Sequence, residues 1–138
     1  MKQIRLLFTI AFFLVTFASF SQKINPGKVV VIYEVDFTLE VGMTFELLEQ
    51  MYLKEYVPAI KKNFPGVEFC IMKGERGERT GKYIEFLVFE SLDERNKWFP
   101  QKRKSSAETK QALNNMREIQ DRMVKLYSSV TYTHYVVL

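Results

Sequence analysis

The stretch "KEYVPAIKKNFPGVEFC", residues 54–70, decides how this chain folds. Its first half has the composition of a helix, although Pro58 lies within it. Pro65 and Gly66 end such a helix, and the apolar run that follows them is typical of a β-strand. A helix that stops at a Pro-Gly pair and turns directly into a strand indicates a crossover between two strands of one sheet.

The residues before this stretch complete the crossover helix. Thr44 is the expected N-cap, and Glu46 lies in the first turn, where the helix dipole favours an acid. Pro58 lacks a backbone N–H and is expected to kink the last turns without abolishing the helix. Apolar side chains recur at helical spacing and predict the buried stripe, which consists of Phe45, Leu48, Tyr52, Tyr56 and Ala59, widened by Leu47, Met51 and Ile60.

Four segments rich in β-branched and aromatic residues predict strands at Val29–Phe37, Val67–Lys73, Lys82–Glu90 and Val130–Leu138. Between the second and third lies "GERGERTG", which predicts a charged hairpin connection. It does not match a phosphate-binding loop, because Arg76 stands where the first glycine belongs and a strand follows instead of a helix.

The second crossover is predicted to contain two helical sections. Ser91 and Glu94 form a capping-box pattern before a short helix that ends near Phe99. Ser105 and Glu108 form a second one before a long helix. Its predicted buried stripe comprises Ala112, Met116, Ile119, Met123 and either Leu126 or Tyr127. The order β-α-β-β-α-β is the ferredoxin-like pattern, an α+β fold with a four-stranded antiparallel sheet and helices on one face.

Residues 1–21 have the layout of a secretory signal peptide. Lys2 and Arg5 precede an apolar run, and Ser19 and Ser21 are the small residues before the expected cut. The run is short for a membrane span, which needs about 20 apolar residues. We therefore expect an exported protein, periplasmic or extracellular, with no stable membrane span after cleavage; an uncleaved N-terminal anchor is the alternative.

Charge and cysteine content narrow the possible partners. Removing residues 1–21 leaves 117 residues with 18 basic and 16 acidic side chains, a net charge of +2. So small a charge argues against nucleic acid as the main partner. Cys70 is the only cysteine, so no internal disulfide can form, and its apolar strand predicts a buried, inert thiol.

Residues 28–138 resemble the dimeric α/β-barrel superfamily, which includes antibiotic-biosynthesis-type monooxygenases, stress-responsive A/B barrel proteins and NIPSNAP-type domains. The resemblance rests on the element order and on "YVPAIKKNFPGVEF" (56–69) and "EFLVFESLDERNKWF" (85–99). It implies a homodimer in which a second sheet covers the face that the helices leave bare. The strand pattern agrees, because both sides of the first and third strands carry apolar residues.

Six residues are candidates for a functional site. His134, Glu34 and Glu85 are the candidate catalytic residues, since an acid or a histidine in an apolar strand can handle protons in a pocket. We expect Glu34 or Glu85 to join His134 and Tyr132 in one polar pocket, unless these residues face solvent at strand ends. Tyr132, Tyr33 and Trp98 are the candidate ligand-binding residues, with a core or interface role as the alternative for Trp98.

No metal site or cofactor is predicted. One histidine and one cysteine far apart do not supply the clustered ligands that a metal needs. In relatives that degrade haem, an Asn, a Trp and a helical His are typical of the pocket. This chain has Trp98, but its first strand has no Asn and its long helices have no His.

Two functions follow from these patterns. The first is an exported dimeric barrel that binds a small apolar or amphipathic ligand without catalysis, since no nucleophile, metal cluster or cofactor loop is evident. The alternative is a cofactor-independent monooxygenase-like or isomerase-like enzyme that acts on an aromatic or polyketide-like substrate. A membrane-tethered interaction module would require that the signal is retained.

Overall fold

The computed structural model describes residues 24–100 and 105–138, so the predicted signal peptide at 1–21 lies outside the described residues. The predicted α+β, β-α-β-β-α-β organisation is confirmed. In chain order the elements are β1 (Val29–Phe37), α2 (Phe45–Met51), η2 (Tyr52–Tyr56), α3 (Val57–Asn63), β2 (Glu68–Lys73), β3 (Tyr83–Phe89), α4 (Leu92–Trp98), α5 (Ala107–Asn115), α6 (Arg117–Leu126) and β4 (Tyr127–Val136).

The four strands form one antiparallel sheet in the order β2-β3-β1-β4. In the middle of the sheet, Tyr33 of β1 lies opposite Glu85 of β3 and Tyr132 of β4. The last strand begins three residues earlier than predicted, at Tyr127, directly after α6. It lies at an edge of the sheet, beside β1.

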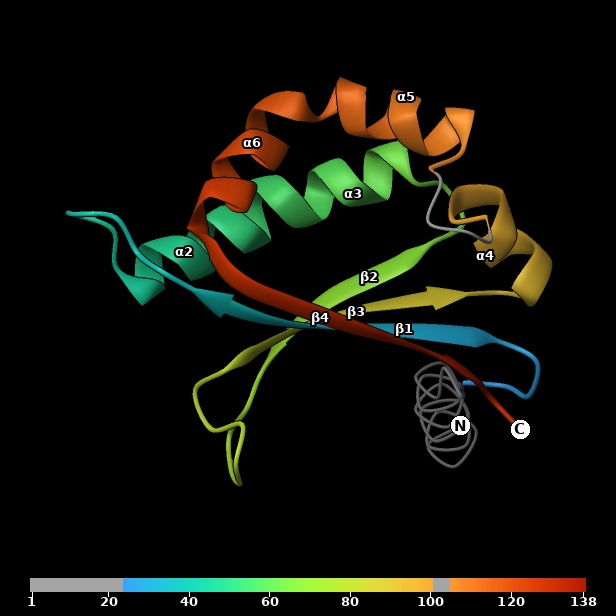
Figure 1. Cartoon of the computed structure of the whole chain (residues 1–138), viewed down its shortest axis with the longest axis horizontal. Helices are drawn as coiled ribbons and strands as arrows, with labels where there is room; N and C mark the ends of the chain where they lie inside the picture. Colours follow the sequence, from blue (N-terminus) through green and yellow to red (C-terminus); the bar gives the residue numbers. More distant parts are fainter. Residues whose placement is uncertain (1–23, 101–104) are drawn as a thin grey trace, which may run out of the picture.

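The helices of the described residues all lie on one face of the sheet, as Figure 1 shows. The odd-numbered residues of β1 point toward the helices, and Val29, Val31 and Val35 are each 1% exposed. Val29 and Val31 pack with the buried helical residues into one apolar core, whereas Phe45 and Leu47 of the predicted stripe are exposed. No helix in the described part of the chain is long and apolar enough to cross a bilayer.

The first crossover helix is widened in the middle and not simply kinked. Thr44 caps α2 as predicted, since its Oγ1 accepts a hydrogen bond of 3.2 Å from the Leu47 N–H. Tyr52–Tyr56 then form a π-helical turn, and the Val57 N–H bonds to the Tyr52 carbonyl five residues back. Pro58 follows in the first turn of α3, which continues the same helix, so this turn has one backbone donor fewer.

The second crossover differs from the prediction in two details. The cap of α5 is Ser106, whose Oγ accepts a 3.0 Å hydrogen bond from the Thr109 N–H, so Ser105 and Glu108 are not the capping pair. The predicted single long helix is interrupted at Met116, which leaves the α-region with φ −114° and ψ 21°. The predicted stripe is nevertheless buried on both α5 and α6, and it includes Leu126.

The second face of the sheet carries no helix among the described elements (Figure 1). Ile32, Ile84 and Phe86 are half-buried there, and Met72 is 42% exposed. Cys70 belongs to the same face and is exposed, so the prediction of a buried thiol is wrong for the single chain. The apolar pattern on both sides of the strands is real. Val30 and Val88 on this second face are buried, each 6% exposed, but no described helix covers the face.

Candidate functional site

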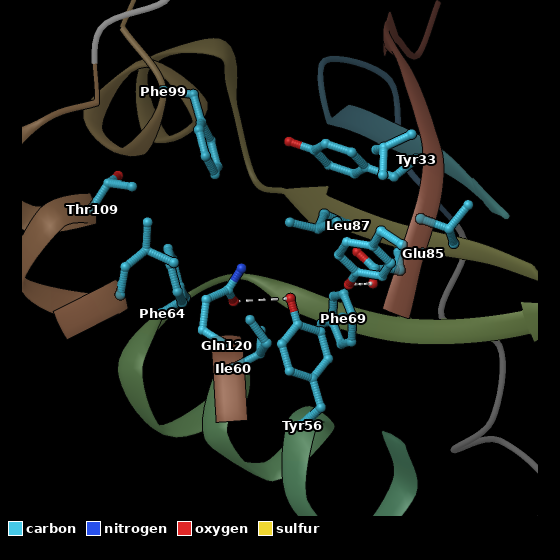
Figure 2. Close-up of a pocket in the computed structure, with 14 residues that line it drawn as sticks. Tyr33, Tyr56, Ile60, Phe64, Phe69, Glu85, Leu87, Phe99, Thr109 and Gln120 are labelled. Atoms are coloured by element: carbon cyan, nitrogen blue, oxygen red, sulfur yellow. Dashed lines mark hydrogen bonds between the residues drawn. The ribbon is translucent and has the colours of Figure 1, made fainter. Parts of the chain in front are cut away.

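A cavity of about 190 Å³ lies between the sheet and the helices. Figure 2 shows its wall, where aromatic rings from the sheet, η2 and the loop after α4 surround a single acid. Its lining residues come from every layer of the fold and are Tyr33, Val35, Tyr56, Ile60, Phe64, Phe69, Glu85, Leu87, Phe99, Thr109, Leu113, Gln120, Tyr127 and Val130.

Glu85 is the only acid in this lining and is 7% exposed. It sits in the middle of β3, with Tyr33 opposite it on β1 and Ile71 opposite it on β2. Its Oε1 accepts hydrogen bonds of 2.7 Å from the hydroxyls of Tyr52 and Tyr127. A buried carboxyl is costly unless it is hydrogen-bonded, and these two phenols supply the compensation.

Burial raises the pKa of Glu85, and the hydrogen bonds from Tyr127 and Tyr52 lower it only in part. Burial and the nearby Glu85 charge raise the pKa of Tyr33 to about 12. The same causes raise the pKa values of Tyr52, Tyr56 and Tyr127 above the ordinary tyrosine value. All four phenols therefore stay protonated near neutral pH, and Glu85 alone sets the charge of the cavity.

Two of these tyrosines, Tyr52 and Tyr56, are the first and last residues of the π-helical turn. Residues four apart lie on the same face of a helix. Tyr52 and Tyr56 are both buried, and their ring centroids lie 5.5 Å apart in an edge-to-face arrangement. The Tyr52 hydroxyl reaches Glu85, and the Tyr56 hydroxyl donates a 3.3 Å hydrogen bond to Gln120 Oε1 of α6.

Two predicted residues, Tyr132 and His134, lie beside the cavity on the edge strand β4. Tyr33 lines the cavity and packs against Tyr132, with ring centroids 5.6 Å apart. The Tyr132 ring in turn meets the His134 ring at 5.5 Å. His134 Nδ1 lies 3.4 Å from Arg95 Nη1, and burial together with the Arg95 charge lowers the pKa of His134. His134 is therefore a neutral imidazole beside a cation and lies outside the cavity lining.

Glu34 and Trp98 lie elsewhere. Glu34 is on the opposite face of the sheet, where it forms an ion pair of 2.9 Å with Arg79. Trp98 is 4% exposed and belongs to the core, with its ring 5.0 Å from that of Phe64. Its indole N–H donates a 3.2 Å hydrogen bond to Glu94 of the same helix.

The structure thus places one of the three candidate catalytic residues, Glu85, in the cavity. Glu34, which the sequence grouped with it as an equal candidate, is separated from it by the sheet. Tyr132 reaches the site only through Tyr33. A carboxyl paired with phenols and surrounded by aromatic rings can hold a ligand and can accept a proton. It does not form a nucleophile–base pair of the kind that acyl transfer uses.

Sequence reasoning did not assign Tyr52, Tyr127 or Gln120 to a site. Tyr52 was placed in the buried stripe of the first helix, and Tyr127 was an alternative end of the last one. Their signal is chemical: a phenol in an apolar stripe needs a hydrogen-bond partner when it is buried. Glu34 and Glu85 were the two candidate acids in apolar strands, and Glu85 is the partner in the structure.

No protein-family model matches this chain, and no curated protein is significantly similar to it. Several solved structures share its architecture. A NIPSNAP family protein from Agrobacterium tumefaciens matches with a TM-score of 0.56 and 13% identity, over 79% of this chain and 91% of that one. An uncharacterised NIPSNAP-like domain protein from Burkholderia xenovorans matches with a TM-score of 0.58 and 9% identity, over 83% and 88%.

A third match is a dimeric protein of unknown function with a ferredoxin-like fold from Bacteroides fragilis, with a TM-score of 0.51 and 13% identity over 80% of this chain and 96% of that one. This chain has the ferredoxin-like fold. The similarity to NIPSNAP structures agrees with the resemblance seen in the sequence. At these identities it establishes the fold and leaves the activity to be argued from the cavity.

The raised pKa of Glu85 makes a testable prediction about stability. The folded chain binds this proton more tightly than the unfolded chain, whose ordinary pKa is 4.5. The resulting stabilisation is fully present below that pH and is lost as the pH rises through the folded pKa. Each tenfold difference in proton affinity corresponds to about 1.4 kcal/mol.

We therefore expect Glu85→Gln to gain unfolding free energy relative to the wild type as pH rises from about 4 to about 8. Urea unfolding of both proteins across this range measures the effect. Glu34→Gln, on the opposite face, is the matched control for loss of a carboxylate. Parallel pH profiles for the wild type and Glu85→Gln would show that the carboxyl titrates as it does in the unfolded chain.

Proposed function

We propose that this protein is an exported homodimer in which each chain binds one small aromatic or amphipathic ligand between sheet and helices, without catalysing a reaction. The observation that supports the proposal most strongly is the aromatic cavity with Glu85 in its wall. Binding sites are typically apolar concavities with a few placed polar groups, and this cavity has that composition.

The size of the cavity limits the ligand. An apolar engineered cavity of about 150 Å³ accommodates benzene. The cavity here, about 190 Å³, therefore suits a single ring with a short substituent. A polycyclic substrate of the polyketide type would require the helices to move away from the sheet. This size argument, together with the separation of Glu34 and His134 from the cavity, favours binding of a small ligand over the enzymatic alternative.

The dimer is inferred from the uncovered sheet face. Ile32, Ile84, Phe86 and Met72 present apolar surface there, and a second copy of the same sheet is a cover of matching shape. The Bacteroides fragilis structure with the same fold is described as dimeric. Pairing through this face would leave the helix side, and with it the cavity, in each chain intact.

Export is inferred from the first 21 residues alone. Cleavage after Ser21 should give a mature protein of 117 residues that begins at Gln22. The intact mass of the protein recovered from an expressing cell's exterior or periplasm measures this directly. A mass that includes Met1 and the apolar run would favour the membrane-tethered module instead.

Ligand binding is tested by native mass spectrometry of the purified mature protein. We expect a bound small molecule whose mass is lost on denaturation. Leu113→Phe adds volume inside the cavity and should abolish this species, because the protein interior has no spare room for both. Leu53→Phe, at a 63% exposed position on η2, is the control. Retention of the ligand in Leu113→Phe would place its binding site elsewhere.

The dimer is tested by light scattering in dilute solution. Phe86→Glu places a charge at the centre of the uncovered face, and burying it unpaired in an interface should shift the protein to monomers. Leu92→Glu, which changes a 46% exposed residue at the start of α4, should remain dimeric. A wild-type protein that is monomeric at micromolar concentration would contradict the proposed assembly.

A further inference from the structure

The cavity lining can carry a negative charge but no positive one. Glu85 is the only carboxyl in the lining, and no Lys, Arg or His is among the described residues that form it. The other polar groups are the phenols, the Thr109 hydroxyl and the Gln120 amide, all of them neutral. An anion entering this space would lose its hydration and meet no positive group, so the lining disfavours anionic ligands.

The apolar part of the lining adds to this preference. Six of its members are aromatic: Tyr33, Tyr56, Phe64, Phe69, Phe99 and Tyr127. The face of an aromatic ring carries the negative part of its quadrupole and attracts cations within about 6 Å of the centroid. Figure 2 shows rings from β1, β2, η2 and the α4 loop around the cavity, and Tyr127 of β4 also lines it, so a cation inside has aromatic rings in several directions.

We propose that the preferred ligand of this cavity is a small aromatic amine in its protonated form, with the ammonium N–H donating to the Glu85 carboxylate and the ring packed among the aromatic side chains. This inference rests on the proposed binding function and specifies its ligand class. The two phenol donors occupy Oε1 of Glu85. A carboxylate has a second oxygen with acceptor capacity of its own, which suits an additional donor.

Binding of the cation should change the protonation state of Glu85. Without a cation, burial favours the neutral carboxyl; with an ammonium beside it, the charged form is favoured. The titratable groups that face Glu85 are Tyr33 from β1, Tyr52 and Tyr56 from η2, and Tyr127 from β4. Their pKa values are raised, so they do not titrate between about pH 5 and about pH 8.

Three probes of nearly equal size test the inference: benzylamine, benzyl alcohol and benzoate. Each is titrated by calorimetry into the ligand-free mature protein at about pH 5 and about pH 8. We expect benzylamine to bind at least about tenfold more tightly than benzyl alcohol at the higher pH, and benzoate to bind most weakly. Benzylamine affinity should rise with pH and the affinity for the alcohol should not, because only the amine requires the ionised Glu85.

Two variants locate the effect. Glu85→Gln should weaken benzylamine at least about tenfold and leave benzyl alcohol within about threefold of the wild type. Leu113→Phe should weaken both, because it fills the cavity itself. If Glu85→Gln folds poorly, the pH dependence of benzylamine affinity in the wild-type protein still tests the proposal.

The outcomes separate the two proposals. Equal affinity of amine and alcohol, preference for benzoate, or a benzylamine affinity that does not change with pH would overturn the cationic ligand class. If the alcohol still binds and is lost in Leu113→Phe, the cavity remains a ligand site. Binding of none of the three probes would overturn the ligand class and count against the proposed function as well.

Discussion

The hydrogen bonds that join Glu85 to Tyr52 and Tyr127 are the constraint on which this structure most depends. They connect the centre of β3 to η2 and to the start of β4, three segments far apart in the chain. A carboxyl in the interior of a four-stranded sheet is tolerated only if its acceptors are satisfied. Meeting that demand fixes the height of the crossover helix above the sheet, and the aromatic cavity forms beside the same contact.

The π-helical turn lies in the same part of the structure, because Tyr52 is its first residue. Pro58 removes a backbone donor from the crossover helix, and the turn before it is wider than an α-turn. Tyr52 and Tyr56 lie four residues apart on this turn, and their hydroxyls reach Glu85 of the sheet and Gln120 of α6, respectively. π-turns within helices occur frequently at functional sites. Here the turn contributes Tyr56 to the cavity lining and Tyr52 as a hydrogen-bond donor to Glu85.

Much of the fold could be predicted from the sequence because it depends on periodicity. Helical stripes, capping residues such as Thr44 and the Pro-Gly stop are local features that predict the individual elements. The order of these elements then predicts the ferredoxin-like fold. The site could not be predicted as well, because it depends on which strands are neighbours. Glu34 and Glu85 look alike in sequence, and only the register of β1 against β3 places one in the cavity and the other with Arg79. Cys70 was assigned to the interior for a related reason: its strand is apolar, but its side faces away from the helices.

Energetics also argue that the acid serves ligand binding in addition to its structural contacts. An aliphatic residue at position 85 would fill the same space among aromatic rings with no desolvation penalty, and its tyrosine partners could be phenylalanines. Local departures from the rules of core composition are expected where a protein binds something, because the cost is then offset in the bound state. Glu85 is such a departure: it is the one charged group in the lining, it lies beside a space large enough for a ring, and its burial cost is reduced when a positive ligand is present.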